Sequence, residues 1–373
     1  MKTKFFFMTA IVLCAVAANA NTWRINYDEN AHADFRTLKQ ACESPEVQDG
    51  DIFYMEPGFH NGSDEDNTIS RPCTVIGPGW GFKNNAGEEI EVSTTHFTSN
   101  ISVSENGVHI VGLNAQEVSI LLNKLYTNVN NPQRDVIIER CRCSSIYFSY
   151  NYYFNNMIRN NLVFQSIRLG AEAKYCTIDN NIICSYRQGG YISIDGADPG
   201  NYEGTRIDHN TIIATNVSNC IRIFSNTPIM MITNNIVINT FLNCSAHVSD
   251  FSDGTANNYN VYSITPEQYA AETTTKYSDH PTNQYVGATV ENTFVNAIQG
   301  DYYDEAMRYM VQAGNVAKTA ASDGGECGAF GGEHPYVLCG RPQGIPYLYD
   351  VDVPEHTTNN TLSISFKVAG QNE

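Results

Sequence analysis

The sequence predicts an all-β fold in which parallel strands coil into a solenoid. Three observations predict it. A six-residue phrase, Met157-Ile158-Arg159-Asn160-Asn161-Leu162 in its first clear copy, recurs along the chain, each copy has a polar corner at its fourth and fifth positions, and the copies lie 20 to 29 residues apart. The second asparagine of the phrase falls at Asn161, Asn181, Asn210 and Asn235, in steps of 20, 29 and 25 residues. The unequal steps indicate that some corners carry longer loops.

The repeated asparagines predict an amide ladder inside the solenoid. One coil cannot bury its own apolar face, so the coils must stack about 4.8 Å apart as parallel strands. Stacking aligns the four asparagines, and each side chain bonds to the next. Cys141 stands at the same place one step earlier, and we expect its thiol to fill a ladder position. Including a copy at residues 257–261, roughly seven to nine coils result, and we expect the asparagine corner to end near residue 263.

The first 20 residues have the pattern of a cleavable signal peptide. Lys2 and Lys4 precede an apolar run, which ends in the small-residue motif Ala18-Asn19-Ala20. We therefore expect a secreted, periplasmic or cell-surface protein that begins near Asn21. Later apolar runs are too short to span a membrane.

The charge of the mature chain restricts its partners. Removal of the two signal-peptide lysines leaves 20 basic residues against 40 acidic ones, a net charge of −20. Such a chain repels nucleic acid and anionic lipid, so we expect no non-specific binding to either. An anionic glycan would need local arginine or lysine side chains, or a divalent cation.

The cysteines fall into two groups. Five lie in or beside strand runs, where we expect buried thiols, with a ladder of disulfides as the alternative: Cys141, Cys176, Cys184, Cys220 and Cys244. Two pairs flank loops and are the better disulfide candidates: Cys42 with Cys73, and Cys327 with Cys339.

Several phrases resemble those of the right-handed parallel β-helix proteins of the pectate-lyase-like superfamily. The resemblance covers most of residues 34–332, and it is carried by residues 34–42, 50–59, 73–79, 294–296, 300–302 and 327–332. It implies a right-handed parallel β-helix over residues 21–332, closed at its start by a short helix within residues 34–42.

The residues after the coils lack the asparagine repeat. Residues 264–312 contain two helix-like patches, at 266–272 and 304–312, which we expect to pack against the last coils. Residues 333–373 are expected to form an extended tail that packs on the solenoid. Within this tail, residues 361–368 alternate with period 2, as one half-buried strand does. Such a strand would lie along the solenoid, pair with a partner or begin a further segment, and the sequence does not choose among these.

A candidate ligand-binding face follows each asparagine corner. The strand alternation places Arg168, Ser193, Arg222 and Asn243 on one outward column, with Tyr147 one coil earlier. The two arginines would lie about 10 Å apart, which suits a sugar carboxylate or sulfate. Asp195 is the neighbouring carboxylate, and residues 196–202 would form a wall. The alternative is a solvated polar face covered by arginine stems.

A second outward column precedes the corner and contains Glu139, Arg159, Asp179, Asp208 and Thr233. Asp179 and Asp208 are the candidate Ca²⁺ ligands of the chain, or the acid and base of a glycosidase. The alternative is a ladder of ion pairs. His209 replaces the first asparagine of its corner, and we expect it to be a hydrogen-bonding residue there.

The family resemblance implies a polysaccharide lyase acting on an acidic glycan. Arg168 or Arg222 would neutralise a uronate carboxylate, and Tyr147, a deprotonated arginine or Lys174 would abstract the C5 proton. The residues that would contact the substrate are Ser193, Asp195, Asn243 and Lys174. The chain lacks the paired aspartates and the Gly-His-Gly and Arg-x-Lys motifs of polygalacturonases. Two non-catalytic alternatives therefore stand beside the enzyme: a glycan-binding surface protein and an adhesin. The sequence does not predict the oligomeric state.

Overall fold

A computed structural model gives the structure of the chain. It describes residues 20–80, 94–124, 127–128, 130–149, 152–170, 172–184, 190–194, 202–214, 220–223, 230–239, 248–249, 256–267, 282–295, 309–337, 340, 347–352 and 364–369. Residues 1–19 of the predicted signal peptide lie outside this set.

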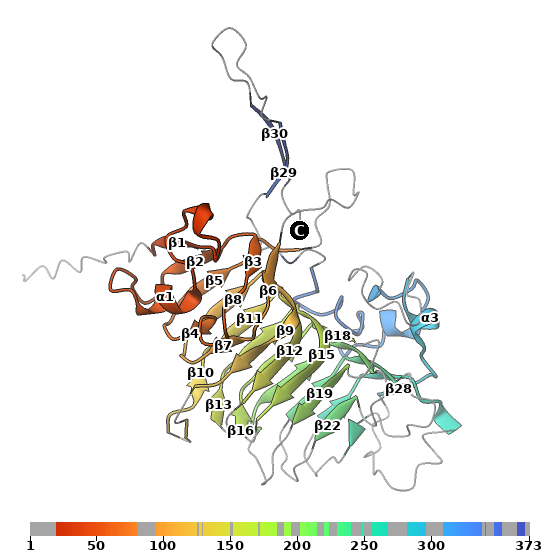
Figure 1. The fold of residues 1–373 in the computed structure, drawn as a ribbon. Helices are drawn as coiled ribbons and strands as arrows, with labels where there is room; N and C mark the ends of the chain where they lie inside the picture. Colours follow the sequence, from red (N-terminus) through yellow and green to blue (C-terminus); the bar gives the residue numbers. More distant parts are fainter. Residues whose placement is uncertain are drawn as a thin grey trace, which may run out of the picture.

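Two long parallel sheets dominate the described chain (Figure 1). The first has ten strands in chain order, so each coil adds one strand beside the strand of the coil before. They are β1 (Thr22–Ile25), β2 (Ile52–Met55), β5 (Thr74–Ile76), β8 (His109–Val111), β11 (Ile137–Glu139), β14 (Met157–Arg159), β17 (Thr177–Asp179), β20 (Thr205–Asp208), β23 (Met230–Thr233) and β26 (Ala256–Asn258). The predicted all-β class with stacked parallel strands is confirmed.

The second sheet forks after its long central strands. It runs through β4 (Thr68–Ile69), β7 (Ile101–Val103), β9 (Asn114–Leu122), β12 (Arg142–Phe148) and β15 (Leu162–Leu169). One branch continues through β18 (Ile182–Cys184), β21 (Thr211–Ala214), β24 (Ile236–Asn239), β27 (Val261–Tyr262) and β28 (Gln284–Tyr285). The other branch, which we call the outer branch, contains β19 (Tyr191–Ile194), β22 (Ile221–Ile223) and β25 (Val248–Ser249).

Shorter sheets complete the coils. A three-stranded parallel sheet consists of β10 (Gln133–Arg134), β13 (Tyr152–Phe154) and β16 (Glu172–Lys174). Nearer the N-terminus, β3 (Gly58–His60) pairs with β6 (Thr95–Phe97). Helix α1 (Leu38–Glu43) begins within the segment predicted to close the first coil. Thr37 caps its N-terminus, because the Thr37 side chain accepts a hydrogen bond from the Gln40 amide.

The asparagine ladder is confirmed by side-chain hydrogen bonds. The Asn181 amide nitrogen donates to Asn210 Oδ1 at 3.0 Å and to the carbonyl of Ile158 at 2.9 Å. The same pattern joins Asn161 to Asn181, Asn210 to Asn235 and Asn235 to Asn260. Cys141 takes the expected first position, because its backbone amide donates to Asn161 Oδ1. The predicted end near residue 263 is wrong, since the Asn260 backbone amide donates to Asn283 Oδ1 at 2.8 Å.

Most cysteines follow the prediction of buried thiols. Cys141, Cys176, Cys184 and Cys220 are buried thiols outside any disulfide, and Cys244 lies outside the described residues. Burial raises the pKa of Cys141 to about 12, so the thiol stays neutral as a small apolar group. The predicted bridge between Cys42 and Cys73 is wrong, because both are buried free thiols. Cys327 is also free, whereas its predicted partner Cys339 is not described.

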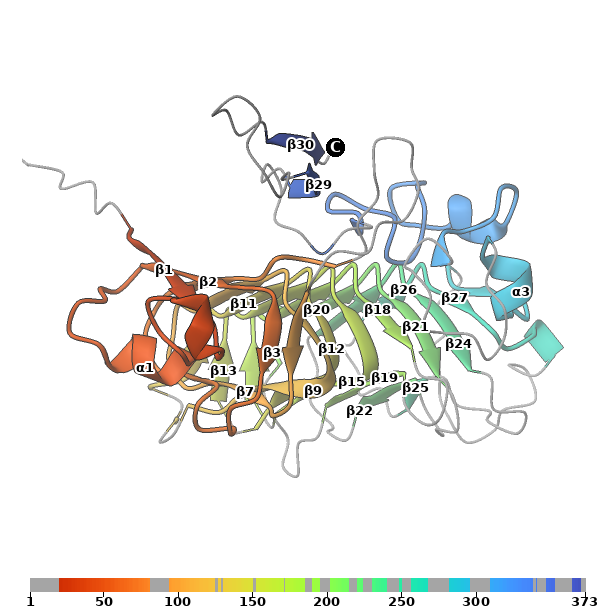
Figure 2. The same ribbon diagram turned by 45° about the horizontal axis from the view of Figure 1, so that its top comes forward.

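A second apolar core lies outside the coils, between the β18–β21–β24 strands and a covering segment that includes α3 (Val290–Thr293) and residues 309–336. Ile213 and Ile236 face it from the strands, and Phe294 and Tyr309 face it from the covering segment. Figure 2 shows α3 and the blue segment outside the stacked coils. The prediction that the chain after the coils packs against them is therefore correct for these residues. The helix-like patches at 266–272 and 304–312 lie mostly outside the described residues.

The C-terminal strand has a partner that the sequence did not predict. Strand β30 (Ser365–Ala369) pairs antiparallel with β29 (Tyr347–Asp352), and the hairpin stands clear of the stacked sheets in Figures 1 and 2. Ile364 and Phe366 are 53% and 63% exposed, whereas Tyr336 at the start of the tail is buried. Packing of the whole tail on the solenoid stays a prediction.

Candidate functional site

The predicted outward column exists on the second sheet. Tyr147 of β12 is in register with Arg168 of β15, Arg168 with Ser193 of β19, and Ser193 with Arg222 of β22. The alternate residues of these strands, among them Ile146, Ile167 and Ile192, are fully buried in the core of the coils. Period 2 therefore turns the column to the outer surface.

Arg168 lies at the centre of an aromatic cluster. Its guanidinium carbon lies 5.0 Å from the ring centre of Tyr147 and 5.4 Å from that of Tyr191, within the range of a cation–π contact. The guanidinium also donates a hydrogen bond to the Tyr191 hydroxyl, and its Nε contacts Ser166 Oγ at 3.4 Å. Both rings therefore hold the cation in place on the outer face.

The other predicted members of this site contribute unequally. Ser193 is only 1% exposed, so its hydroxyl offers little surface to a ligand. Asp195 and Asn243 lie outside the described residues, and Ser249 of β25 takes the register position after Arg222. The sequence reasoning missed Tyr191. It precedes Ser193 by two residues, so the same period 2 that placed Ser193 also places Tyr191 on this face.

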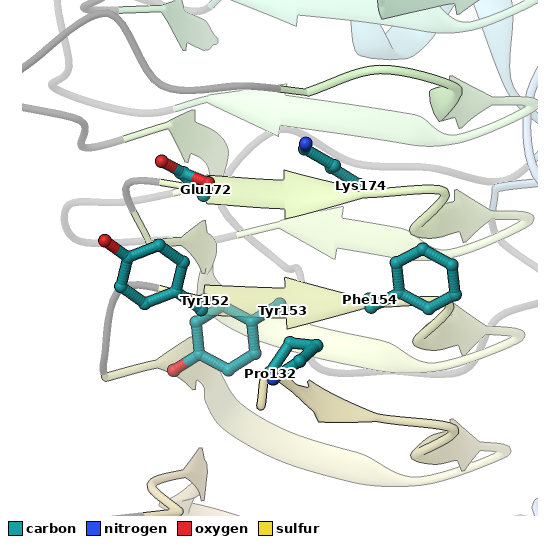
Figure 3. Close-up of a pocket in the computed structure, with 6 residues that line it drawn as sticks. All are labelled: Pro132, Tyr152, Tyr153, Phe154, Glu172 and Lys174. Carbon is teal, nitrogen blue, oxygen red and sulfur yellow. The ribbon is translucent and has the colours of Figure 1, made fainter. Parts of the chain in front are cut away.

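Lys174 lies on a different surface, because the chain turns a corner after Leu169 and enters the three-stranded sheet. Lys174 is in β16, where it lines a pocket with Pro132, Tyr152, Tyr153, Phe154 and Glu172 (Figure 3). The structure therefore separates Lys174 from the Arg168 cluster, with which the sequence reasoning had combined it.

The second predicted column also exists, on the first sheet. Glu139, Arg159, Asp179, Asp208 and Thr233 occupy one register position on consecutive strands. The carboxylate of Glu139 accepts from Arg159 at 2.7 Å and contacts His109 Nε2 at 2.9 Å. Burial raises the pKa of Glu139, but these two partners outweigh burial and lower it to about 2. This end of the column is an ion-pair ladder.

Asp208 is surrounded by donors. Thr233 Oγ1 and the side-chain amide of Asn234 donate to Oδ1 at 2.6 and 2.9 Å, and Arg206 donates to Oδ2 at 2.9 Å. His209 Nδ1 lies 3.2 Å from Oδ2. Burial raises the pKa of Asp208, and the bonds from His209 and Thr233 outweigh it, lowering the pKa to about 2. His209 is thus the corner hydrogen-bonding residue that the sequence predicts.

Asp179, one rung away, has the opposite character. Burial raises its pKa to about 6, and the lowering effect of Arg159 does not compensate. Its Oδ1 is buried and has no hydrogen-bond partner among the described residues. Adjacent aspartates whose pKa values lie this far apart have the electrostatic arrangement of an acid and base pair.

The covering segment closes over this corner. Asn180, beside Asp179, donates from its side chain to the carbonyls of Ala329 and Gly331 at 2.9 and 2.8 Å. Gly332 packs against the His209 ring so closely that a Cβ there would lie 3.0 Å from ring atoms. The described geometry therefore gives Asp208 a structural task within the coils, whereas Asn180 holds the covering segment by hydrogen bonds and the His209 ring packs against it. Within the described part of the chain, no group of three or more His, Cys, Asp or Glu side chains is arranged to hold a metal ion. Ca²⁺ at Asp179 and Asp208 stays a prediction.

The comparisons leave the chain's function to its own geometry. No described helix is both long enough and apolar enough to cross a membrane. A comparison of the chain with protein-family models, with curated proteins and with solved structures finds no match. The structure thus shows an all-β chain of long, stacked parallel sheets that are compatible with a parallel β-helix.

Proposed function

We propose that this chain is an exported, right-handed parallel β-helix protein that binds an acidic polysaccharide along the outer face of β12, β15, β19 and β22. The observation that carries the proposal is the Arg168 guanidinium held between the rings of Tyr147 and Tyr191. Export is supported by the signal-peptide pattern of residues 1–20.

The electrostatics of this cluster favour an anionic ligand. Among the described residues, no carboxylate lies within ion-pair distance of Arg168, although the mature chain carries twice as many acidic as basic residues. The described contacts of Arg168 are with tyrosine rings and hydroxyl groups, none of which neutralises its positive charge. A planar guanidinium binds a carboxylate or sulfate through paired hydrogen bonds, and the flanking rings restrict its rotamers. Arg222, two rungs away, would provide a second contact about 10 Å along the stack.

Binding without chemistry is the function this face supports best. A lyase on the same face is the second candidate, because Tyr147 lies beside the Arg168 guanidinium and would, as a phenolate, take the C5 proton of a uronate and become a neutral phenol. The two functions share the carboxylate contact and differ only in the fate of the sugar.

The test is a screen of the mature protein against uronic-acid and sulfated polysaccharides, read both by affinity electrophoresis and by absorbance of an unsaturated product. We expect retardation in at least one acidic gel and a loss of retardation in Arg168→Ala. Arg36→Ala is the control, because Arg36 is an exposed arginine that also stacks on a tyrosine, at 5.2 Å from the Tyr27 ring centre. Equal retardation of wild type and Arg168→Ala would contradict the proposal. An absorbance that increases with time would show that the protein is a lyase rather than a binder without chemistry.

A further inference from the structure

The outer face of the three-stranded sheet forms a second, separate surface. Tyr152 is in register with Glu172, and Phe154 with Lys174. The residues between them, Tyr153 and Ala173, are buried in the core of the coils. The four outward side chains therefore form a two-by-two patch on neighbouring strands, which Figure 3 shows at the pocket. We call these four residues the β13–β16 patch.

Aromatic rings are exposed at one end of this patch. Phe154 is 38% exposed, and next to it the ring of Tyr175 is 44% exposed. The two ring centres are 5.3 Å apart in an edge-to-face arrangement. A hydrogen bond between the Tyr175 side chain and Glu203 raises the pKa of the phenol and fixes the ring's position. Rigid, exposed rings provide contact area at a low cost in conformational entropy.

The polar groups of the patch are matched in charge. Glu172 and Lys174 lie on the same face of β16. They are two residues apart, so their Cα atoms are separated by about 6.6 Å. One accepts hydrogen bonds and the other donates them. Nearby, Arg134 is in register with Phe154 and lies 3.8 Å from the carboxylate of its neighbour Asp135. The surface therefore has no excess of positive charge, unlike the Arg168 cluster.

We infer that the β13–β16 patch binds a neutral pyranose unit of a glycan. A pyranose has a face of C–H groups, which would pack on Phe154, and hydroxyl groups around its rim. One hydroxyl of the sugar would donate a hydrogen bond to the Glu172 carboxylate, and a neighbouring hydroxyl would accept one from the Lys174 ammonium group. This site does not depend on the acidic-glycan site, because it lies on another sheet and uses another interaction.

The experiment is a titration of the mature protein with neutral oligosaccharides of glucose, galactose, mannose and xylose, followed by calorimetry with the best binder. We expect Phe154→Ala to weaken binding about tenfold and Phe154→Trp to preserve it. Lys174→Gln should weaken binding about fivefold, with no dependence on ionic strength. Phe59→Ala is the matched control, since Phe59 is 65% exposed and lies on the β3–β6 sheet.

The outcomes separate this inference from the proposed function. Arg168→Ala should leave neutral-sugar binding unchanged, and Phe154→Ala should leave retention by an acidic polysaccharide unchanged. Failure of every neutral oligosaccharide to bind, or equal affinities of wild type and Phe154→Ala, would overturn the neutral-sugar site alone. A second result would also overturn it: Lys174→Gln weakens binding of a uronate ligand only, and the difference from wild type disappears at high salt. The patch would then be an anion site.

Discussion

Each asparagine of the ladder both accepts and donates hydrogen bonds through its side-chain amide. Asn181 Oδ1 accepts from the backbone and side-chain amides of Asn161, and its own amide nitrogen donates to Asn210 and to Ile158. The residue before it, Asn180, has a φ of +52°, a left-handed conformation that asparagine adopts more readily than most residues. The paired asparagines thus turn the chain and also satisfy the buried polar groups that the turn exposes.

Replacing a ladder asparagine should therefore destabilise the whole stack. We expect Asn181→Leu to lower the free energy of unfolding by about 1 to 3 kcal/mol, because the amides of Asn161 and the carbonyl of Ile158 lose their partners. The measurement is urea unfolding. Asn130→Leu is the control, since Asn130 is exposed. Equal stability of the two variants would show that the ladder contributes nothing.

The pKa of Asp179 predicts a specific pH dependence of stability. Its folded pKa of about 6 is above the ordinary value of 3.8, so the folded chain prefers the protonated acid. Its contribution is complete below pH 3.8 and is lost as the pH rises through 6. We expect Asp179→Asn to match wild type near pH 4 and to be more stable by about 1 to 2 kcal/mol at pH 8.

Asp208 provides the control of opposite sign. Its folded pKa is lowered to about 2, so its contribution is present above pH 3.8 and is lost as the pH falls through 2. Asp208→Asn should therefore be less stable than wild type at pH 8, in the same urea titration. A pH-independent effect of Asp179→Asn would mean that its carboxyl is not buried in the folded chain.

At the scale of elements, the covering segment is the feature that the repeat did not predict in detail. Its contacts to the coils join residues far apart in the sequence, such as Asn180 with Ala329 and Asn234 with Ser322. Local patterns carry no information about such pairs. One sign was present: Ile182 and Ile183 are consecutive apolar residues, and both are buried because one faces each core.

The bonds from Asn180 should control the local stability of the covering segment. We expect Asn180→Gly to speed amide hydrogen exchange about tenfold in residues 326–334, because the two bonds to Ala329 and Gly331 are lost while glycine tolerates the positive φ. Asn155→Gly is the matched control, since Asn155 has a φ of +53° and bonds Asp135 at another corner. Equal exchange rates of residues 326–334 in both variants would show that the Asn180 side chain does not stabilise the docked covering segment.

At the scale of the whole molecule, the repeat correctly predicted the stacked parallel strands and the register of both outward columns. The steps between Asn161, Asn181 and Asn210 set the coil length, and period 2 within each strand then aligned Tyr147 with Arg168. What the sequence could not place was the corner after Leu169, which moves Lys174 to another sheet. Nor could it predict that Cys42 and Cys73 remain thiols, because flanking a loop does not fix the geometry of a bridge.

The distribution of charge connects the architecture to the proposed function. The chain carries a formal net charge of −18, which would become −20 on the proposed removal of residues 1–20 and would repel an acidic polysaccharide at long range. At short range the stack brings Arg168 and Arg222 onto the same column. Binding should therefore depend on these two side chains rather than on the field of the whole protein.

The most direct test of the central claim is calorimetry of an acidic polysaccharide against wild type and the double variant Arg168→Ala, Arg222→Ala. Charge-assisted contacts of this kind are worth about 1.5 to 3 kcal/mol each, so the double variant should bind about two to four powers of ten more weakly. The difference should shrink as salt is added, because screening weakens the wild-type contacts. A double variant that binds every acidic glycan as tightly as wild type, at low and at high salt, would contradict the claim.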